Sequence, residues 1–216
     1  MEILHIDCSP RPESCSRRLS AGIVSKLLEF IPEAQIRRRD LGFEPIPHSD
    51  AAYAATLATP ASLAAEGRCA DALRLAEQLI EEVENADLIV NGTPMNNFTV
   101  PSVLKAWIDQ ILRVGRTMRS TPAGKVGLLR DRPVFVGIAS GGVFMAEGSN
   151  QPDFLTPYLS AVLNCIGIQT VYYLPFEGTA FLDDARAAQL RSSLIATIEP
   201  TMVGLLRDRV GMSASQ

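Results

Sequence analysis

Residues 93–98 carry the side chains best suited to bind a flat ring with a polar edge. They follow an apolar run at 86–90, and the members that could touch a ligand are Met95, Asn96, Asn97 and Phe98. The amides offer hydrogen-bond donors and acceptors, while the Met and Phe side chains offer soft apolar surface. An ordinary turn would use the same residue types, because Asn and Pro are common in turns.

A second segment, residues 9–16, is rich in hydroxyl groups at the point where a helix is expected to begin. Its candidate ligand-binding members are Ser9, Ser14, Cys15 and Ser16. Hydroxyls beside the unpaired N–H groups of a helix N-terminus favour a phosphate, and Arg11 or Arg17 could add a counter-charge. Alternatively, Ser14 or Ser16 only caps the helix. The segment has neither Gly-x-Gly-x-x-Gly nor Gly-Lys-Ser/Thr, which argues against a dinucleotide turn and a P-loop.

A third segment, Ser140-Gly141-Gly142, comes directly after the apolar run 133–139. A continuous apolar run of this kind fits a strand that is covered on both faces. The two glycines at its carboxyl end permit positive φ angles and a close approach of the backbone to a ligand. The alternative is a flexible turn without a ligand.

Each of the three segments follows a strand in the expected secondary structure. The expected strands lie at 3–7, 34–41, 87–91, 133–139 and 168–174. Helices alternate with them, which predicts an α/β fold whose five-stranded parallel sheet has helices on both faces. Without a dinucleotide motif the flavodoxin-like strand order 2-1-3-4-5 is favoured, and its cofactor site uses the loops after strands one and three. A phosphate loop beside a ring-binding loop describes FMN.

The chain is expected to form a single domain over residues 1–210. We expect an irregular insertion at about 42–65, which runs over the surface or lies at a subunit contact. Residues 211–216 are expected to form a frayed end. The three adjacent arginines at 37–39 indicate an edge strand that is protected by charge. Contact of these arginines with a cofactor phosphate is the alternative.

Turn residues predict where several helices begin and end. Thr99 and Thr156 are expected to cap helices whose first turns contain a proline, and Gly167 is expected to end the second of these. A short hairpin is expected within residues 113–129. Pro200 is expected to interrupt the final helical region.

Composition narrows the partners and the compartment. A net charge of −4 and a pI of about 5.3 give no electrostatic basis for nucleic-acid binding. The chain has no apolar run long enough for a transmembrane helix and starts directly in a strand, so we expect no membrane span and no signal peptide. The four cysteines lack zinc-ligand spacing, which favours reduced thiols in a cytoplasmic protein without a metal site. Cys8 and Cys15 flank the first loop, where a redox sensor is an alternative to two small structural residues.

Over nearly its whole length the sequence resembles the FMN-dependent NADH:quinone oxidoreductases, also called azoreductases. That family reads Pro-Met-Tyr-Asn-Phe followed by a Pro-Ser-x-Leu-Lys-x-Trp-Ile-Asp helix, which residues 94–98 and 101–109 match apart from Asn96. The serine segment, one residue shorter than its common form, and the Gly-rich residues at 124–129 and 140–142 also match. One departure is that Asn96 stands where the family has Tyr. Another is that residues 117–120 replace a segment that usually carries Phe and Tyr.

The resemblance implies ping-pong hydride transfer from NADH or NADPH to a quinone or azo compound on tightly bound FMN. It implies that the serine segment holds the phosphate, that residues 95–98 line the ring and that residues 140–142 approach its pyrimidine side. It further implies a homodimer, with Met118 and Phe144 near the acceptor. A flavodoxin-like electron carrier and a non-catalytic FMN-binding module are the alternatives.

Overall fold

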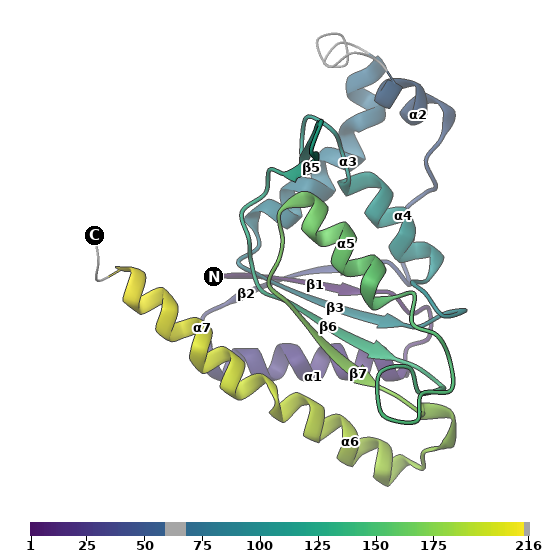
Figure 1. Cartoon of the computed structure of the whole chain (residues 1–216), viewed down its shortest axis with the longest axis vertical. Coiled ribbons are helices and arrows are strands. Elements are labelled where there is room, and N and C mark those ends of the chain that lie inside the picture. Colours follow the sequence, from purple (N-terminus) through teal and green to yellow (C-terminus); the bar gives the residue numbers. More distant parts are fainter. Residues whose placement is uncertain (59–67, 214–216) are drawn as a thin grey trace.

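A computed structural model describes residues 1–58 and 68–213 (Figure 1). The strands are β1 (Glu2–Asp7), β2 (Gln35–Asp40), β3 (Leu88–Pro94), β4 (Met118–Thr121), β5 (Gly124–Gly127), β6 (Val134–Ala139) and β7 (Val171–Phe176). The helices are α1 (Cys15–Phe30), α2 (Ala51–Ala58), α3 (Arg68–Asn85), α4 (Ser102–Ile111), α5 (Thr156–Ile166), the 3-10 turn η1 (Thr179–Phe181), α6 (Asp184–Ala196) and α7 (Ile198–Ser213).

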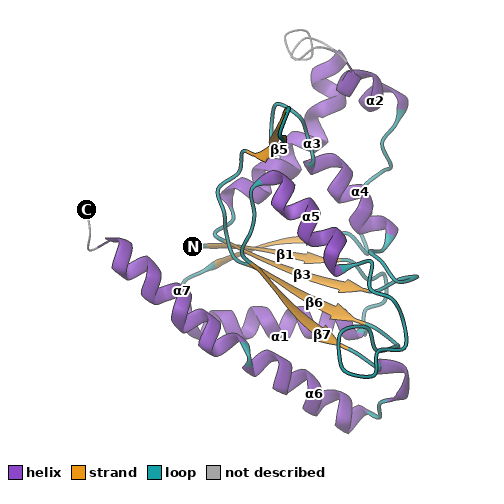
Figure 2. Cartoon of the chain, viewed as in Figure 1, coloured by secondary structure: helices purple, strands orange, loops and turns teal. Residues whose placement is uncertain are grey.

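The main sheet has five parallel strands in the order β2-β1-β3-β6-β7. Because β4 and β5 form a separate hairpin, β6 and β7 are the fourth and fifth strands of this sheet. The predicted flavodoxin-like order 2-1-3-4-5 is therefore confirmed, and so is the hairpin predicted within 113–129. Figure 2 shows the strands fanned between two layers of helices.

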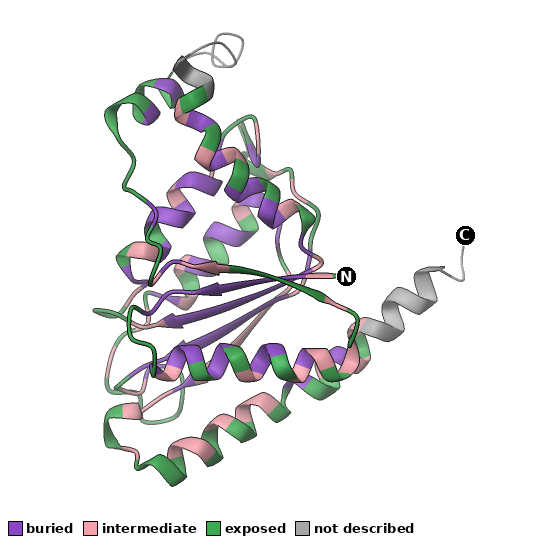
Figure 3. Cartoon of the chain, turned by 180° about the vertical axis from the view of Figure 1, so that it is seen from behind, coloured by how far each residue is buried: buried purple, intermediate pink, exposed green. Residues whose placement is uncertain are grey.

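Helices cover both faces of the sheet, as predicted. One apolar cluster joins one face to α3, α4 and α5, and a second joins the opposite face to α1, α6 and α7 (Figure 1). The strands in the middle of the sheet are buried on both sides, whereas β2 is largely exposed (Figure 3). Burial of this apolar surface is the main term that holds the layers together.

β2 is the edge strand that its arginines predict. Arg37 Nε donates to Glu2 Oε1 at 2.7 Å, Arg38 Nη2 donates to Asp7 Oδ2 at 3.0 Å, and Arg39 binds Glu82. These three side chains pair with carboxylates of the protein. They therefore protect the edge, and the alternative of a contact with a cofactor phosphate has no support in this arrangement.

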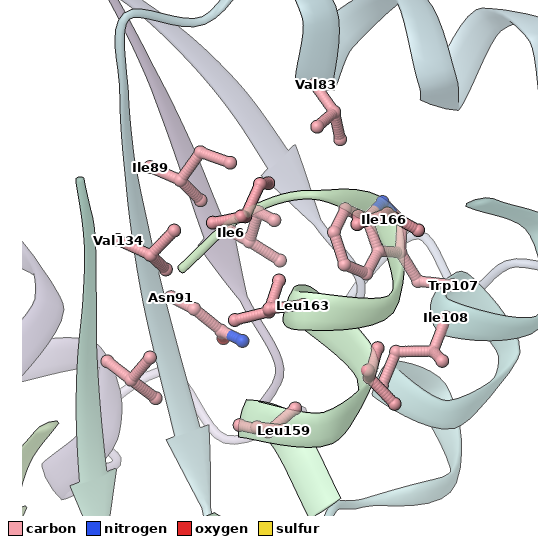
Figure 4. Close-up of a pocket in the computed structure, with 13 residues that line it drawn as sticks. Ile6, Val83, Ile89, Asn91, Trp107, Ile108, Val134, Leu159, Leu163 and Ile166 are labelled. Atoms are coloured by element: carbon pink, nitrogen blue, oxygen red, sulfur yellow. The ribbon is translucent and has the colours of Figure 1, made fainter. Parts of the chain in front are cut away.

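A small enclosed cavity lies in the core between the sheet and helices α4 and α5 (Figure 4). Its volume is about 20 Å³, close to the space that one water molecule needs, and its walls are apolar apart from Asn91 and Trp107. Nε1 of Trp107 is buried there without a hydrogen-bond partner among the described residues. This cavity is a packing defect of the core and too small for an organic ligand.

Two helix starts differ from the prediction in the residue that occupies the N-cap position. α4 begins at Ser102 with Pro101 as its N-cap, so Thr99 is not a cap. α5 begins at Thr156 itself, with Leu155 as N-cap, and Asp153 accepts hydrogen bonds from the backbone N–H groups of both residues. Gly167 ends α5 with a φ of 104°, as predicted.

Two longer segments also differ from the prediction. Residues 51–58 of the expected irregular insertion form α2, and residues 59–65 lie outside the described part of the chain. The final helical region is interrupted at Thr197, so Pro200 falls in the first turn of α7, where its missing N–H costs little. α7 is described up to Ser213, and the frayed end expected at 211–216 stays a prediction. Residues 214–216 lie outside the described part of the chain.

The last strand begins at Val171, three residues later than expected, because Asp131 binds the backbone that precedes it. Oδ1 of Asp131 accepts from the N–H groups of Gln169 and Thr170 at 2.8 and 3.1 Å, and Oδ2 accepts from the Thr170 hydroxyl at 2.7 Å. Burial raises the pKa of Asp131, but these hydrogen bonds outweigh it and leave the pKa below its ordinary value. The ionised carboxylate thus fixes where β7 starts.

We therefore expect Asp131→Asn to lower the free energy of unfolding at neutral pH. A carboxylate with a lowered pKa stabilises the fold above its unfolded-state pKa, and this stabilisation is lost as the pH falls through the folded-state value. The difference between wild type and variant should therefore be largest above about pH 5 and shrink below about pH 4. Urea unfolding from pH 7 to pH 3 measures it, with Glu33→Gln at an exposed position as the control. A difference independent of pH would contradict the role given to the carboxylate.

Candidate functional site

Three loops leave the same edge of the sheet, and backbone hydrogen bonds tie them together just beyond the strand ends. The bonds run from Cys8 N to Gly92 O, from Met95 N to Ala139 O and from Ser140 N to Phe176 O, each at 2.9 Å. The bonded residues lie at the carboxyl ends of neighbouring parallel strands, which is where open α/β sheets bind ligands. All three segments singled out in the sequence meet at this edge.

A cleft of about 340 Å³ opens between the first and second loops, within the range of small-molecule sites. The residues of the predicted site that line it are Ser9, Ser14, Cys15, Ser16, Met95, Asn96 and Gly141. Pro10, Arg11, Pro94, Ala139 and Thr179 complete the lining. Among the described residues, no group of His, Cys, Asp and Glu side chains is arranged to hold a metal ion.

The first loop ends in the N-terminus of α1, which opens at the cleft. Ser14 is the N-cap, and its Oγ accepts from the backbone N–H of Arg17 at 3.3 Å. Ser14 therefore caps α1, and its part in binding a ligand stays a prediction. Its hydroxyl also lies 3.3 Å from that of Ser16, so the two buried hydroxyls sit side by side beside the first N–H groups of the helix. This end of the cleft offers uncharged donors suited to a phosphate.

Arg17 does not supply the counter-charge considered for the first loop. Its guanidinium is buried behind the loop, with Nη2 at 2.5 Å from Asp40 Oδ1 and Nη1 at 3.4 Å from Asp7 Oδ2. Burial raises the pKa of Asp7, but hydrogen bonds from His5 and Ser20 and the charge of Arg17 outweigh this, so the net pKa is lowered. The negative charges of these two carboxylates neutralise the positive charge of Arg17. Arg11, which is exposed and lines the cleft, is the arginine free to approach an anion.

The second loop contains a tight turn from Asn96 to Thr99, closed by two backbone hydrogen bonds between those residues. Its central residues, Asn97 and Phe98, both have positive φ angles, 48° and 70°. Asn tolerates this region, whereas a bulky Phe there is strained. Strain of this kind is retained mainly where the side chain has a task. Phe98 is held 44% exposed beside the cleft and outside its lining.

The third loop is assembled by residues that sequence analysis missed. Nε2 of Gln151 donates to Ser140 Oγ at 2.7 Å and lies 3.1 Å from the Met95 sulfur, linking the second and third loops. The Thr179 hydroxyl donates to the Ser140 carbonyl at 3.0 Å. Gln151 and Thr179 are distant from Ser140 in the chain and lie in no recognisable motif. No local signal could therefore have found them.

Some predicted residues lie away from the cleft in this chain. Met118 is buried at the base of the hairpin, with its sulfur 3.1 Å from that of Cys165. Phe144 is buried in the core cluster, and its N–H donates to Glu177. Cys8 is fully buried, and burial together with the nearby Asp7 charge raises the pKa of its thiol well above the ordinary value. Cys8 is therefore an unreactive core thiol, which argues against its use as a redox sensor.

Comparison with known proteins places the chain. The family model described as "Flavodoxin-like fold" matches residues 1–198. The FMN-dependent NADH:quinone oxidoreductase 4 of Pseudomonas fluorescens is 43% identical over 87% of this chain and 89% of its own length. The FMN-dependent NADH:quinone oxidoreductase 5 of Burkholderia lata is 44% identical over 89% and 92%. The chain belongs to the FMN-dependent NADH:quinone oxidoreductase family. The resemblance to this family, which the sequence motifs indicated, is confirmed.

Solved structures of this family agree with the fold. An FMN-dependent NADH-azoreductase from Bacillus anthracis, determined in complex with FMN, superimposes with a TM-score of 0.80 over 93% of this chain and 98% of that one, at 23% identity. A second azoreductase from the same species gives a TM-score of 0.77 over 91% and 96%, also at 23% identity. The likeness extends over almost the whole chain, so this chain shares its fold with these two structures.

Ser14 has a separable structural role. We expect Ser14→Ala to lower the free energy of unfolding by about 1 kcal/mol, because the N-cap hydrogen bond to Arg17 N is lost. Ser25→Ala, on the exposed face of the same helix, is the matched control and should change stability by less than about 0.5 kcal/mol. Urea unfolding monitored by circular dichroism measures both. Equal stability of the two variants would show that Ser14 does not cap α1.

Proposed function

We propose that this protein is an FMN-dependent NADH:quinone oxidoreductase that also reduces azo compounds. One observation carries the proposal: the hydroxyl-lined N-terminus of α1 and the Met95–Asn96 loop face one another across a single cleft. The first feature suits a phosphate and the second suits a flat ring with a polar edge. The names of the similar proteins add the same cofactor and reaction.

The residues of the cleft divide the work of binding. Ser9, Ser14, Cys15 and Ser16 would hold the phosphate through hydroxyls and backbone N–H groups. Met95 and Phe98 would border the ring. Asn96 and Asn97 would donate to its polar edge, and residues 140–142 would approach its pyrimidine side. Donors at that side stabilise negative charge on the ring, since charge-assisted hydrogen bonds are strong in a dry site.

When bound, FMN supplies the transfer of a hydride from NADH or NADPH and of two electrons to the acceptor, in ping-pong order. The protein's part is to orient the ring, to leave one face open for the donor and the acceptor in turn, and to limit access of water. Asn96 in place of an aromatic residue leaves that face more polar than in the family pattern. Met118 and Phe144, which the resemblance implies near the acceptor, are buried away from the cleft, so they receive no part in this proposal.

The proposal includes a homodimer in the cytoplasm. Its support is that Phe98 and Phe154 are 44% and 60% exposed and are joined by a backbone hydrogen bond of 3.0 Å, so two apolar rings are available for contact with a second copy. Cys8, Cys15 and Cys165 carry free thiols, which fits a reducing compartment. Among residues 1–58 and 68–213, none of the helices has the length and apolar character needed to cross a bilayer.

Anaerobic mixing tests the proposal directly. Purified protein should bind FMN, NADH should bleach the bound flavin, and a quinone should restore its colour. Bound flavin that neither NADH nor NADPH reduces would favour a non-catalytic module instead, and reduction without quinone turnover would favour an electron carrier.

Ser16→Ala should weaken FMN binding by about 1–2 kcal/mol through a lost phosphate hydrogen bond. Ser25→Ala is the control, and unchanged affinity in Ser16→Ala would remove Ser16 from the site.

Phe98 allows a test that separates stability from activity. Gly adopts a φ of 70° without strain, so Phe98→Gly should leave the free energy of unfolding unchanged or raise it slightly. The rate of quinone reduction should nevertheless fall several-fold, because the ring surface beside the cleft is gone. Thermal unfolding and steady-state NADH oxidation measure the two effects. Full activity in this variant would contradict a role for Phe98 at the site.

A further inference from the structure

Arg17 is held in one orientation by contacts on every side. Its Nη1 donates to Asp40 Oδ2 at 2.8 Å and its Nη2 to Asp40 Oδ1 at 2.5 Å, a paired arrangement that fixes the plane of the guanidinium. The Phe43 ring covers that plane, with its centroid 4.2 Å from the Arg17 Cζ atom. The side chain is 7% exposed and does not line the cleft.

The third nitrogen of this guanidinium, Nε, binds the first loop. Nε of Arg17 donates to the backbone carbonyl oxygen of Ser9 at 2.8 Å. Gly42 packs closely against the same oxygen, because a Cβ atom there would overlap it and lie 2.8 Å from Arg17 Nη2. Gly42 is itself fixed, since its N–H donates to the Asp7 carbonyl at 3.2 Å. The Ser9 carbonyl is thus clamped between Arg17 and Gly42.

The clamp sets the electrostatics of the loop. A carbonyl oxygen carries partial negative charge and would repel an anion, so an anion site needs its carbonyls turned away and its N–H groups and hydroxyls turned inward. Arg17 holds the Ser9 carbonyl on the buried side. Ser9 Oγ, which accepts from Arg11 N at 3.3 Å, remains at the cleft together with the hydroxyls of Ser14 and Ser16.

We infer that Arg17 is a positioning residue for the phosphate end of the cleft, acting through the Ser9 carbonyl and not through its own charge. Asp7 and Asp40 neutralise that charge, and the guanidinium lies behind the loop. This inference rests on the proposed function, because it concerns how the chain selects a phosphorylated flavin. Its specific consequence is that Arg17 matters for FMN and not for riboflavin, the same ring system without the phosphate.

The test compares the affinities of the apoprotein for FMN and for riboflavin, read from quenching of flavin fluorescence. Wild type should prefer FMN. Arg17→Lys keeps a positive charge between Asp7 and Asp40 but loses the directed bond to Ser9, so FMN affinity should fall about tenfold. Riboflavin affinity should stay within about twofold.

Two further variants complete the test. Phe43→Ala removes the exposed ring that braces the guanidinium, with little risk to folding, and should give a smaller loss of about two- to fivefold for FMN alone. Arg38→Gln is the matched control, because Arg38 pairs with the same two carboxylates but its side chain is 57% exposed and does not line the cleft. It should leave both affinities unchanged.

The outcomes separate this inference from the proposed function. Wild type that binds FMN no better than riboflavin would overturn the phosphate loop and the inference with it. Wild type that prefers FMN, with Arg17→Lys and Phe43→Ala weakening both flavins equally or neither, would leave the proposed function standing and overturn only the role of Arg17. If Arg17→Lys does not fold, the ratio in Phe43→Ala decides.

Discussion

Parallel pairing of β1, β3 and β6 is the constraint on which the cleft depends. Their register places Asp7 opposite Gly92 and Gly92 opposite Gly137, so the three strands end at one edge. A slip of one residue would move a loop by about 3.3 Å along the sheet and turn its side chains to the other face. Short hydrogen bonds beyond the strand ends then lock the loops to one another. A shared edge, more than any single side chain, brings three separate segments to one cleft.

Charge and polarity are arranged in layers at this edge. Beneath the first loop lies a cluster of the buried Asp7 and Arg17 and the half-buried Asp40, whose charges compensate one another. Above it lie uncharged hydroxyls and the N–H groups of α1. An acidic protein can in this way present an anion site without an exposed cluster of cations, because oriented dipoles replace them. In the inference drawn above, these ions act by holding the first loop in place and not by contributing net charge.

Local chemistry was sufficient to predict the strand order, both helical layers, the hairpin and the meeting of the three loops. The elements follow from apolar periodicity and turn residues, which are properties of short segments, and the strand order was favoured because the chain lacks a dinucleotide-binding motif. Helix starts were predicted less well, since Pro101 and Asp153 displaced the expected threonine caps. The start of β7 depends on Asp131, which lies 38 residues before Gln169 in the chain. Long-range contacts of this kind leave no mark on the local pattern.

The same limit explains what was missed at the site. Gln151 reaches Ser140 by a fold of the same loop, and Thr179 reaches it from the loop after β7, which the sheet places next to it. Arg17 was considered as a phosphate counter-charge because the sequence does not reveal its burial against Asp7 and Asp40. That burial is a property of the tertiary structure. The strain at Phe98 is equally invisible in the sequence, as it resides in a backbone angle and not in a residue type.

The most direct measurement of the central claim is a crystal structure of the protein grown with FMN. The phosphate should lie within hydrogen-bond distance of Ser16 Oγ and of the first N–H groups of α1, and the ring should lie against Met95 and Asn96. A phosphate bound at another edge of the sheet, or one pointing into solvent with the ring away from Met95, would contradict it.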